Sequence, residues 1–420
     1  MSRPRGFVVV TGSELVRGDR TDLNGPFLAG ELLRLGVEPA RIAIVGDDPA
    51  ELEPALAEGL AADVCVVSGG LGPTHDDRTV ELVARTAGRK LVVDESLEAE
   101  IEGVSRNIAE RLRRPYADFA EGVRKQATLP EGALVLGLAG TAPGLVLETE
   151  AATVVVLPGP PVELRRLWPA ALESAPVQAV LSRARVPDRR VLRFYGSSES
   201  EIARALRESG GEGDGVTATI CARDFEIHVD LFVEEQGSGR ADALVSGLRE
   251  SAGRYLFAED ERPVEALVLD ACREQGLTLA TAESCTGGLV AARLTSVPGS
   301  SDVVLGGVVA YADEVKVREL GVSQELLERH GSVSPEVASA MAAGARERLG
   351  ADVAVAVTGI AGPGGGSEEK PVGLVHLHAE GPGGSLAREL NLPGERDAIR
   401  GRATVAALHL VRTLLSRSRD

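Results

Sequence analysis

The sequence predicts an α/β protein of three domains: a doubly wound α/β domain, a small α+β domain and a second α/β domain. Its 420 residues are more than one ordinary hydrophobic core accommodates. Buried-type strands alternate with amphipathic helices near both ends of the chain, whereas half-exposed strands fill the part between about 186 and 258. We therefore expect domains at 1–170, 171–260 and 261–420.

The N-terminal domain shows a regular alternation of strands and helices. Asp48 and Pro49 open its second helix, and Gly36 closes the first. Repetition of this kind predicts a doubly wound, parallel sheet. The predicted strands are "GFVVV", "RIAIV", "DVCVVS", "GLVLET" and "TVVVLPGPP", and the helices run from about 24 to 36 and from 49 to 61.

The remaining elements follow the same kinds of signal. Ser334 as N-cap, Pro335 in the first turn and Gly350 at the end mark a helix between them. The helix-like "SESEIARALRE" lies between the middle-domain strands "RVLRFYG" and "EIHVDLFVEE". The C-terminal strands are "LTLATA", "DVVLGGVVAYA", "DVAVAVTG" and "VGLVHLHA".

Composition argues against several function classes. A formal charge of −18 and a pI near 5.0 oppose a broad nucleic-acid surface. No apolar run approaches the roughly 20 residues of a membrane span, and the start lacks the layout of a signal peptide. The four scattered cysteines suit free thiols in a reducing compartment. We expect a cytoplasmic protein without nucleic-acid or membrane partners.

The stretch "ATAESCTGG", residues 280–288, ends a predicted strand and begins a helix. Its glycines let the backbone approach a ligand, and free N–H groups at a helix start favour an anion such as phosphate. The alternative is a tight connection in which Thr286 only caps the helix. Cys285 has no base in this stretch and is expected to pack as a small apolar side chain.

Two further groups contain hydroxyl and basic side chains. Ser300 and Ser301 precede a predicted strand, and Tyr311 and Lys316 follow it. A serine needs a base to act as nucleophile, and a lysine serves if its surroundings lower its pKa. The alternative is a solvated Lys316 at a helix start.

Thr358 and Gly359 end another predicted strand, where open α/β sheets bind ligands, and a run of glycines follows them. The guanidinium groups of Arg396 and Arg400 can each bind a phosphate through two N–H donors, or both arginines can be surface residues of a helix.

Four carboxylates follow predicted strands of the N-terminal domain: Glu14, Asp22, Asp76 and Asp77. We expect them to converge at the carboxyl edge of the sheet, beside glycine-rich loops. Such a group suits a Mg²⁺-like cation that bridges a pyrophosphate. Asp76 or Asp77 can instead cap a helix, and His75 is expected in a loop without a metal partner.

Taken together, these motifs resemble the competence/damage-inducible CinA family across nearly the whole chain. The first 170 residues or so resemble its molybdopterin-binding domain, and the last 160 or so resemble its nicotinamide mononucleotide amidohydrolase domain. The first set is "SGGLGPTHDD", "RKQATLPEGA", "GTAPG" and "LPGPPVEL". The second is "AESCTGG", "PGSS", "GGVVAYADEVK", "GSVSPEVASAMA", "TGIAGPGGGSEEKPVG" and "GERDAIR", and "GSSESEIA" matches the connecting domain.

The resemblance implies hydrolysis of nicotinamide mononucleotide to nicotinate mononucleotide and ammonia, in NAD salvage, by a homodimer. For the N-terminal domain it implies an ADP-ribose pyrophosphatase that needs a divalent metal, whereas the amidase needs no cofactor. The alternative for that domain is a non-catalytic pterin- or nucleotide-binding regulatory module. Ser13 and Gly137 favour this alternative, because the family usually has a carboxylate and an asparagine there.

The resemblance also implies roles for individual residues. Either Ser284 or Ser301 attacks the amide, or both position a water molecule, and Tyr311 or Lys316 moves the proton. The metal ligands would be Glu14, Asp22, Asp76 and Asp77. The implied substrate contacts are Thr286, Gly287, Gly288, Thr358, Gly359, Gly362, Arg396 and Arg400 in the amidase, and Gly69, Gly70 and Thr74 in the N-terminal domain.

Overall fold

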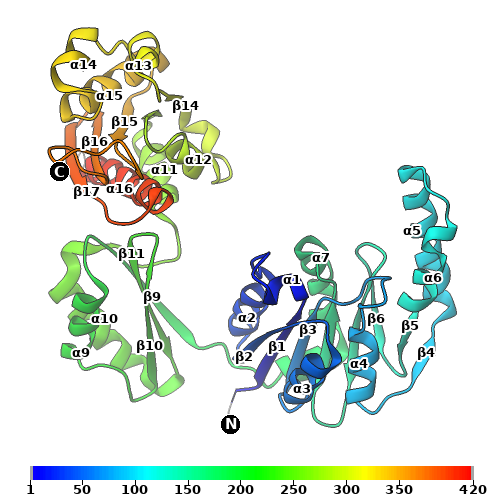
Figure 1. The fold of residues 1–420 in the computed structure, drawn as a ribbon. Coiled ribbons are helices and arrows are strands. Elements are labelled where there is room, and N and C mark those ends of the chain that lie inside the picture. The colour runs from blue at the N-terminus through cyan, green and yellow to red at the C-terminus, as the bar shows by residue number, and fades with distance from the viewer. Residues whose placement is uncertain (1–2, 418–420) are drawn as a thin grey trace. The chain divides into compact units, whose positions relative to one another are not determined.

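The computed structural model describes residues 3–417, and it divides into two compact units (Figure 1). The first unit ends at Pro187 and the second begins at Asp188. The boundary therefore follows residue 187 rather than 170. The reason is the helix Ala175–Leu181 (α8), whose Val177 and Val180 are buried in a core of the first unit.

The first unit contains a six-stranded sheet in the order β2-β1-β3-β8-β7-β6. The four strands β2, β1, β3 and β8 are parallel, as predicted, but β7 and β6 are antiparallel to their neighbours. Only residues 149–152 join β7 to β8, and a parallel crossover needs about a dozen residues. The strands are β1 (Arg5–Thr11), β2 (Glu38–Val45), β3 (Val64–Ser68), β6 (Leu134–Leu138), β7 (Pro143–Glu148) and β8 (Thr153–Leu157), with β4 (Leu91–Val93) and β5 (Thr128–Pro130) forming a separate pair.

Helices cover both faces of this sheet. Alternate residues of β1 enter opposite cores: Phe7 and Val9 lie in one, and Val8 and Val10 in the other. This confirms the doubly wound arrangement. The helices are α1 (Ser13–Val16), α2 (Asn24–Arg34), α3 (Pro49–Gly59), α4 (Thr79–Thr86), α5 (Glu95–Leu112), α6 (Ala117–Gln126), α7 (Pro161–Glu173) and α8.

The second unit begins with the predicted small α+β domain. Four antiparallel strands in the order β10-β11-β9-β12 pack against α9 and α10 around a core of their own. Ser198 caps α9 by accepting the N–H of Glu201. The elements are β9 (Asp188–Tyr195), α9 (Glu199–Glu208), β10 (Val216–Arg223), β11 (Glu226–Val233), α10 (Ser238–Ala252) and β12 (Leu256–Ala258).

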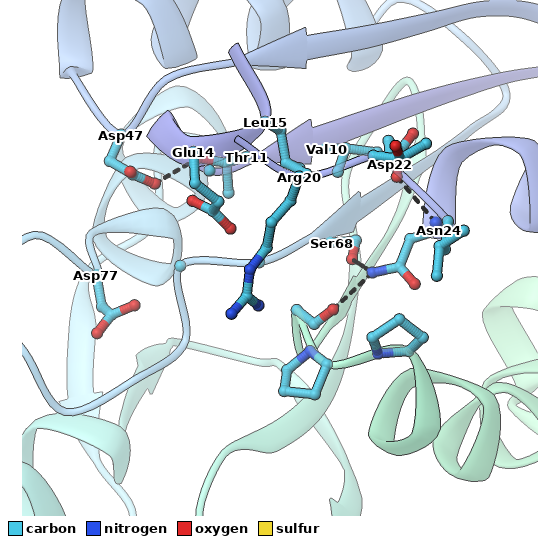
Figure 2. A pocket seen from close by; sticks show the side chains of 18 of the residues that line it. Val10, Thr11, Glu14, Leu15, Arg20, Asp22, Asn24, Asp47, Ser68 and Asp77 are labelled. Carbon is cyan, nitrogen blue, oxygen red and sulfur yellow. Dashed lines mark hydrogen bonds between the residues drawn. The ribbon is translucent and has the colours of Figure 1, made fainter. Parts of the chain in front are cut away.

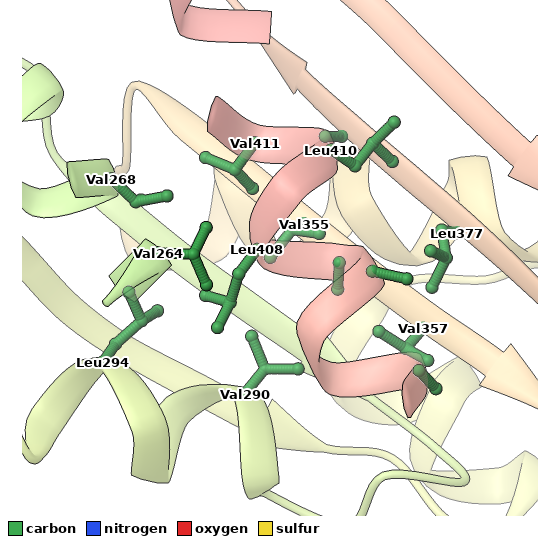
Figure 3. Close-up of a cluster of buried hydrophobic side chains, with 14 of the residues drawn as sticks. Val264, Val268, Val290, Leu294, Val355, Val357, Leu377, Leu408, Leu410 and Val411 are labelled. Atoms are coloured by element: carbon green, nitrogen blue, oxygen red, sulfur yellow. The ribbon is translucent and has the colours of Figure 1, made fainter. Parts of the chain in front are cut away.

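The second unit ends with a five-stranded sheet in the order β14-β13-β15-β16-β17. One face packs against α11 and α16, where Figure 3 shows Leu408 and Val411 beside Val264 and Val268, and the other packs against α15. Strands β14, β13 and β15 are parallel, and β16 and β17 are antiparallel. The elements are α11 (Val264–Gln275), β13 (Leu279–Glu283), α12 (Leu289–Thr295), β14 (Val304–Val309), α13 (Asp313–Leu320), α14 (Gln324–His330), α15 (Pro335–Leu349), β15 (Val353–Gly359), β16 (Leu374–Gly381), β17 (Gly384–Asn391) and α16 (Arg396–Arg417).

Among residues 3–417, no helix has both the length and the apolar character needed to cross a membrane.

Candidate functional sites

A cavity of about 490 Å³ lies at the carboxyl edge of the first sheet (Figure 2). The loops that follow β1, β2, β3 and β8 form its walls, which is where ligands bind in open α/β sheets. Its lining includes Gly12, Glu14, Arg20, Asp22, Asn24, Asp47, Ser68, Gly69, Gly70, Asp76, Asp77 and Gly159.

The loop after β3 needs glycine at its first two positions. Gly69 and Gly70 have φ angles of +107° and +65°. A Cβ on Gly69 would lie 2.4 Å from the carbonyl oxygen of Thr11, and one on Gly70 would lie 2.1 Å from Oγ1 of Thr79. That hydroxyl is buried and has no hydrogen-bond partner in residues 3–417. The loop therefore presents bare backbone to the cavity, as the prediction for Gly69 and Gly70 requires.

The four predicted metal ligands line this cavity without forming a metal site. Residues 3–417 contain no group of three or more His, Cys, Asp or Glu side chains that could hold a metal ion. The Asp22 carboxylate accepts the N–H groups of Asn24 and Gly25 at the start of α2. Asp76 and Asp77 both accept the hydroxyl of Thr74. That hydrogen bond lowers the pKa of Asp76. The four carboxylates thus meet at one cavity, as expected, and the cation that they would bind stays a prediction.

Three cavity residues were not identified from the sequence. The Asp47 carboxylate accepts the N–H and the hydroxyl of Ser13, at 2.9 and 2.7 Å. The Asn24 amide donates to Ser68 Oγ at 2.9 Å and to the Gly159 carbonyl at 2.7 Å, which ties α2 to two strand ends. The side chain of Arg20 extends into the cavity (Figure 2).

In the C-terminal domain, three strand ends place candidate residues at one edge of the sheet. Glu283, the last residue of β13, pairs with Val309 of β14 and with Val357 of β15. Ser284 and Thr358 are the next residues on β13 and β15, and Tyr311 follows Val309 by two residues, so all three emerge at the carboxyl edge. The alternating pattern puts Thr358 on the face that packs against α15, together with Ala354 and Ala356.

Lys316 is buried, with 1% of its surface exposed. Its Nζ donates to the Tyr311 carbonyl at 3.2 Å and to Asp313 Oδ1 at 3.1 Å. Asp313 also accepts the hydroxyl of Ser332 at 2.6 Å. Burial alone would raise the pKa of Asp313, but the hydrogen bonds from Ser332 and Lys316 outweigh it and lower the pKa. The alternative of a solvated Lys316 is therefore wrong.

The turn before α15 connects this group to the end of β15. The Thr358 hydroxyl donates to the Ser332 carbonyl at 2.7 Å. Lys370, in the glycine-rich loop after β15, donates to the carbonyls of His330 and Val333. The loop is thus attached to the same turn through the lysine of its motif "TGIAGPGGGSEEKPVG".

Glu283 fills the helix start that was expected to bind phosphate. Its buried carboxylate accepts the N–H groups of Gly288, Val290 and Ala291, at 2.9, 3.0 and 2.8 Å. These are the free N–H groups and the positive helix end that a phosphate would use. The prediction of an anion site at the start of α12 is therefore corrected, because the protein supplies its own anion.

The two predicted phosphate-binding arginines contact backbone carbonyls in this structure. Arg400 donates to the carbonyls of Cys285 and Thr286, at 3.2 and 3.0 Å. Arg396 donates to the Gly362 carbonyl at 2.7 Å and to the Tyr311 hydroxyl at 3.0 Å. The hydroxyl of Thr286 is buried and has no hydrogen-bond partner in the part of the chain that is described. These contacts hold the loops around Ser284 and Gly362 in place.

Ser301 lies at the opposite edge of the sheet from Ser284. It precedes β14, whose first residue, Val304, pairs with Leu279 at the start of β13. The six residues of β14 span about 20 Å, so they separate Ser301 from Tyr311 and Lys316 within the chain. Within the chain an extended strand therefore separates Ser301 from these residues, and its catalytic role stays a prediction.

Comparison with known proteins identifies the family. Residues 261–415 match the CinA C-terminal domain, and residues 7–176 match the probable molybdopterin binding domain. A CinA-like protein of Mycolicibacterium paratuberculosis is 46% identical over 430 residues, which cover 98% of either chain. The chain belongs to the CinA family.

The chain is similar to further proteins over all or part of its length. A CinA-like protein of Mycobacterium tuberculosis is 45% identical over 427 residues, covering 98% of this chain and 97% of the relative. A solved competence/damage-inducible protein of Agrobacterium tumefaciens is 44% identical over 38% of this chain and 99% of its own, with a TM-score of 0.35. A CinA structure from Thermoplasma acidophilum is 31% identical over 42% of this chain and 98% of its own, with a TM-score of 0.36.

Two positions at which this CinA chain departs from the expected pattern have different surroundings. Ser13 donates to Asp47, which lines the cavity. Gly137 lies in β6 with a φ angle of +106° and is not one of the residues that line the cavity. The first departure therefore bears on the site, and the second does not touch it.

Proposed function

We propose that this CinA protein hydrolyses the carboxamide of nicotinamide mononucleotide to the carboxylate and ammonia. The observation that supports it is the shared sheet edge, where the segments carrying Ser284, Tyr311, Lys316 and Thr358 meet. A serine hydroxyl and a buried amine in one region are the parts that an amidase needs.

In this proposal the Ser284 hydroxyl adds to the amide carbon. Lys316 passes the serine proton to the amide nitrogen, which leaves as ammonia, and an ester to Ser284 remains. Water then cleaves that ester, gives the carboxylate and returns the proton to Ser284. Asp313 and the Tyr311 carbonyl hold the Lys316 Nζ in place for these transfers, and Arg396 orients the Tyr311 hydroxyl.

Ammonia release from nicotinamide mononucleotide tests the amidase proposal. Ser284→Ala should lower turnover at least about 10³-fold, because it removes the nucleophile. Lys316→Met, which keeps the length of the side chain, should also abolish turnover.

Ser301→Ala is the matched control and should keep the parental rate, since Ser301 lies at the other sheet edge. An inactive Ser301→Ala variant, or an active Ser284→Ala variant, would contradict the assignment. If the parent protein released no ammonia from nicotinamide mononucleotide, the proposed amidase function would be wrong.

We also propose that the N-terminal domain hydrolyses the pyrophosphate of ADP-ribose. The cavity of about 490 Å³ supports this, since it combines backbone of the Gly69–Gly70 loop with Arg20 and carboxylates. The described side chains offer no group of three for a resident metal ion. In this proposal the divalent cation therefore enters as part of the substrate, already bound to its pyrophosphate.

Release of AMP from ADP-ribose in the presence of Mg²⁺ tests this second function. Arg20→Ala should lower turnover at least about tenfold, because it removes a cation from the phosphate site. Chelation of the cation should stop the reaction, and Ser284→Ala should leave it unchanged. Binding of ADP-ribose without any turnover would favour the regulatory module instead.

A further inference from the structure

A second, smaller cavity adjoins the first one in the N-terminal domain. It measures about 230 Å³ and shares Gly70 and Asp77 with the cavity of about 490 Å³. The two therefore lie on either side of the loop that follows β3. The second cavity is lined by Leu71, Gly72, Val80, Glu81, Leu91, Lys125, Gln126, Thr128 and Pro143, together with the two shared residues.

The motif "RKQATLP" fixes the loop between the two cavities. The side-chain amide of Gln126 is buried and donates to the Leu71 carbonyl at 2.9 Å, and Lys125 donates to the carbonyl of Thr74. Gly122 of α6 allows close approach, because a Cβ there would lie 2.3 Å from Pro73. Neither proposed activity uses Lys125 or Gln126, but both side chains donate hydrogen bonds to backbone carbonyls of this loop. These contacts do not involve a ligand, so the second cavity is preformed.

The two cavities differ in chemistry. The first is surrounded by carboxylates, Arg20 and bare backbone, which suits a solvated, charged group. The second has an apolar wall of Leu71, Val80, Leu91 and Pro143, and its lining is completed by polar and charged residues, namely Asp77, Glu81, Lys125, Gln126 and Thr128. Mostly apolar walls with a few polar groups are typical of pockets that bind small molecules and cofactors.

We propose that the second cavity is the subsite for the heterocyclic base of a nucleoside diphosphate whose pyrophosphate lies in the first. A nucleoside diphosphate has this polarity along its length, with an aromatic base at one end and charged phosphates at the other. The choice of ADP-ribose as substrate rests on the proposed function. The position of the base rests on the adjoining cavities alone.

Leu91 and Val92 provide a matched pair of variants for the test. They are neighbours in β4 with similar exposures of 41% and 44%, but only Leu91 lines the second cavity. Leu91→Gln weakens the apolar wall without adding charge, and Val92→Gln makes the same kind of change outside it. Thr128→Phe, in the adjoining strand β5, places a ring in the cavity and serves as the second variant.

Calorimetry of the full chain with ADP and with inorganic pyrophosphate separates the base from the phosphates. Leu91→Gln should weaken ADP binding about fivefold, from the lost apolar contact, and Thr128→Phe about tenfold or more. Val92→Gln should bind ADP as the parent does. All three variants should bind pyrophosphate within about twofold of the parent.

Parental ADP affinity in both Leu91→Gln and Thr128→Phe would overturn the proposal. So would an equal loss of pyrophosphate binding, or a parent that binds ADP no more tightly than pyrophosphate. Absence of AMP release from ADP-ribose would remove the pyrophosphatase function and leave this subsite standing, because the binding measurements do not depend on turnover.

Discussion

At the scale of single residues, Cys285 shows how burial decides chemistry. The thiol is 5% exposed and lies in the core that contains α16, and burial raises its pKa to about 11. A cysteine attacks as thiolate, so a thiol with this pKa is a poor nucleophile near neutral pH. Its neighbour Ser284 lies at the sheet edge beside the loops that carry Tyr311 and Thr358. The conclusion drawn from the sequence, that Cys285 packs as an apolar side chain, is confirmed.

Cys285→Ala should therefore keep ammonia release at the parental rate. It should lower the free energy of unfolding by about 1–2 kcal/mol, because it leaves a small cavity in a packed core. Steady-state assays and urea denaturation measure the two effects. Iodoacetamide at pH 8 should label the exposed Cys221 and leave Cys285 unmodified in the folded protein. Loss of turnover in a folded Cys285→Ala variant would return the thiol to the mechanism.

Residue types and motifs alone identified the glycine loop and the carboxylates of the first cavity, but not Arg20, Asn24 or Asp47. They did not separate Lys316 in the interior from a solvated lysine, and they did not identify Asp313 or Glu283. A signal for Asp313 was present, since it precedes Lys316 by three residues on a helix and such pairs are neighbours. Nothing in the sequence indicated the role of Glu283, because the N–H groups that it accepts were expected to bind a phosphate.

At the scale of elements, α16 of the C-terminal domain contacts the small α+β domain. His409 of this helix stacks on Tyr195 of β9, with ring centres 3.8 Å apart. Its Nε2 lies 2.6 Å from Glu226 Oε1, and Arg412 donates to its Nδ1 at 3.4 Å. A neutral imidazole that donates through Nε2 and accepts at Nδ1 satisfies both contacts.

Both members of this pair titrate away from their ordinary ranges. Burial lowers the pKa of His409, and the hydrogen bond with Glu226 only partly offsets it. Burial alone would raise the pKa of Glu226, but hydrogen bonds from His228 and His409 outweigh it and bring the pKa to about 2. As the pH falls, His409 and Glu226 therefore take up protons at a higher pH in the unfolded chain than in the folded chain.

The second unit should lose stability as the pH falls from about 6.5, the ordinary pKa of histidine, and again below about 4.5, that of Glu226. His409→Gln keeps a donor for Glu226 but does not titrate, so it should flatten the first part of this dependence. It should also cost about 1–2 kcal/mol at pH 8 through the lost ring stacking.

Hydrogen exchange of the α16 amides, measured from pH 8 to pH 5, reports the stability of this unit. His75→Gln is the control, since His75 is exposed and belongs to the other unit. An unchanged pH dependence in His409→Gln would assign the acid loss to other groups.

The elements themselves were largely predictable, because burial patterns, caps and glycine turns are local properties of the chain. The N-cap Asp48, the N-cap Ser334 and the final glycine Gly350 all occupy the positions expected of them. The directions of β6 and β7, by contrast, differ from the predicted parallel arrangement. They follow from the short connections 139–142 and 149–152, which allow only antiparallel pairing between neighbouring strands.

At the scale of the whole molecule, an acidic chain is proposed to act on anionic nucleotides. With a charge of −18, the protein has no general attraction for phosphate, so each site has to supply it locally. The first unit offers bare backbone and Arg20, and the second offers Arg396 and Arg400 near the Ser284 loop. Both sites lie at the carboxyl edges of parallel strands, which is a property of the α/β architecture.

The sequence by itself determined the family, the α/β class and the motifs from which the sites are built, since these are written in residue types and short spacings. Only the tertiary structure decided which of those residues meet. Strand register places Ser301 and Ser284 at opposite edges of the sheet, and packing buries Lys316. The Glu283 carboxylate occupies the helix start that was expected to bind phosphate. The smaller cavity beside Leu91 could likewise not be predicted from the sequence, because its walls come from segments that only folding brings together.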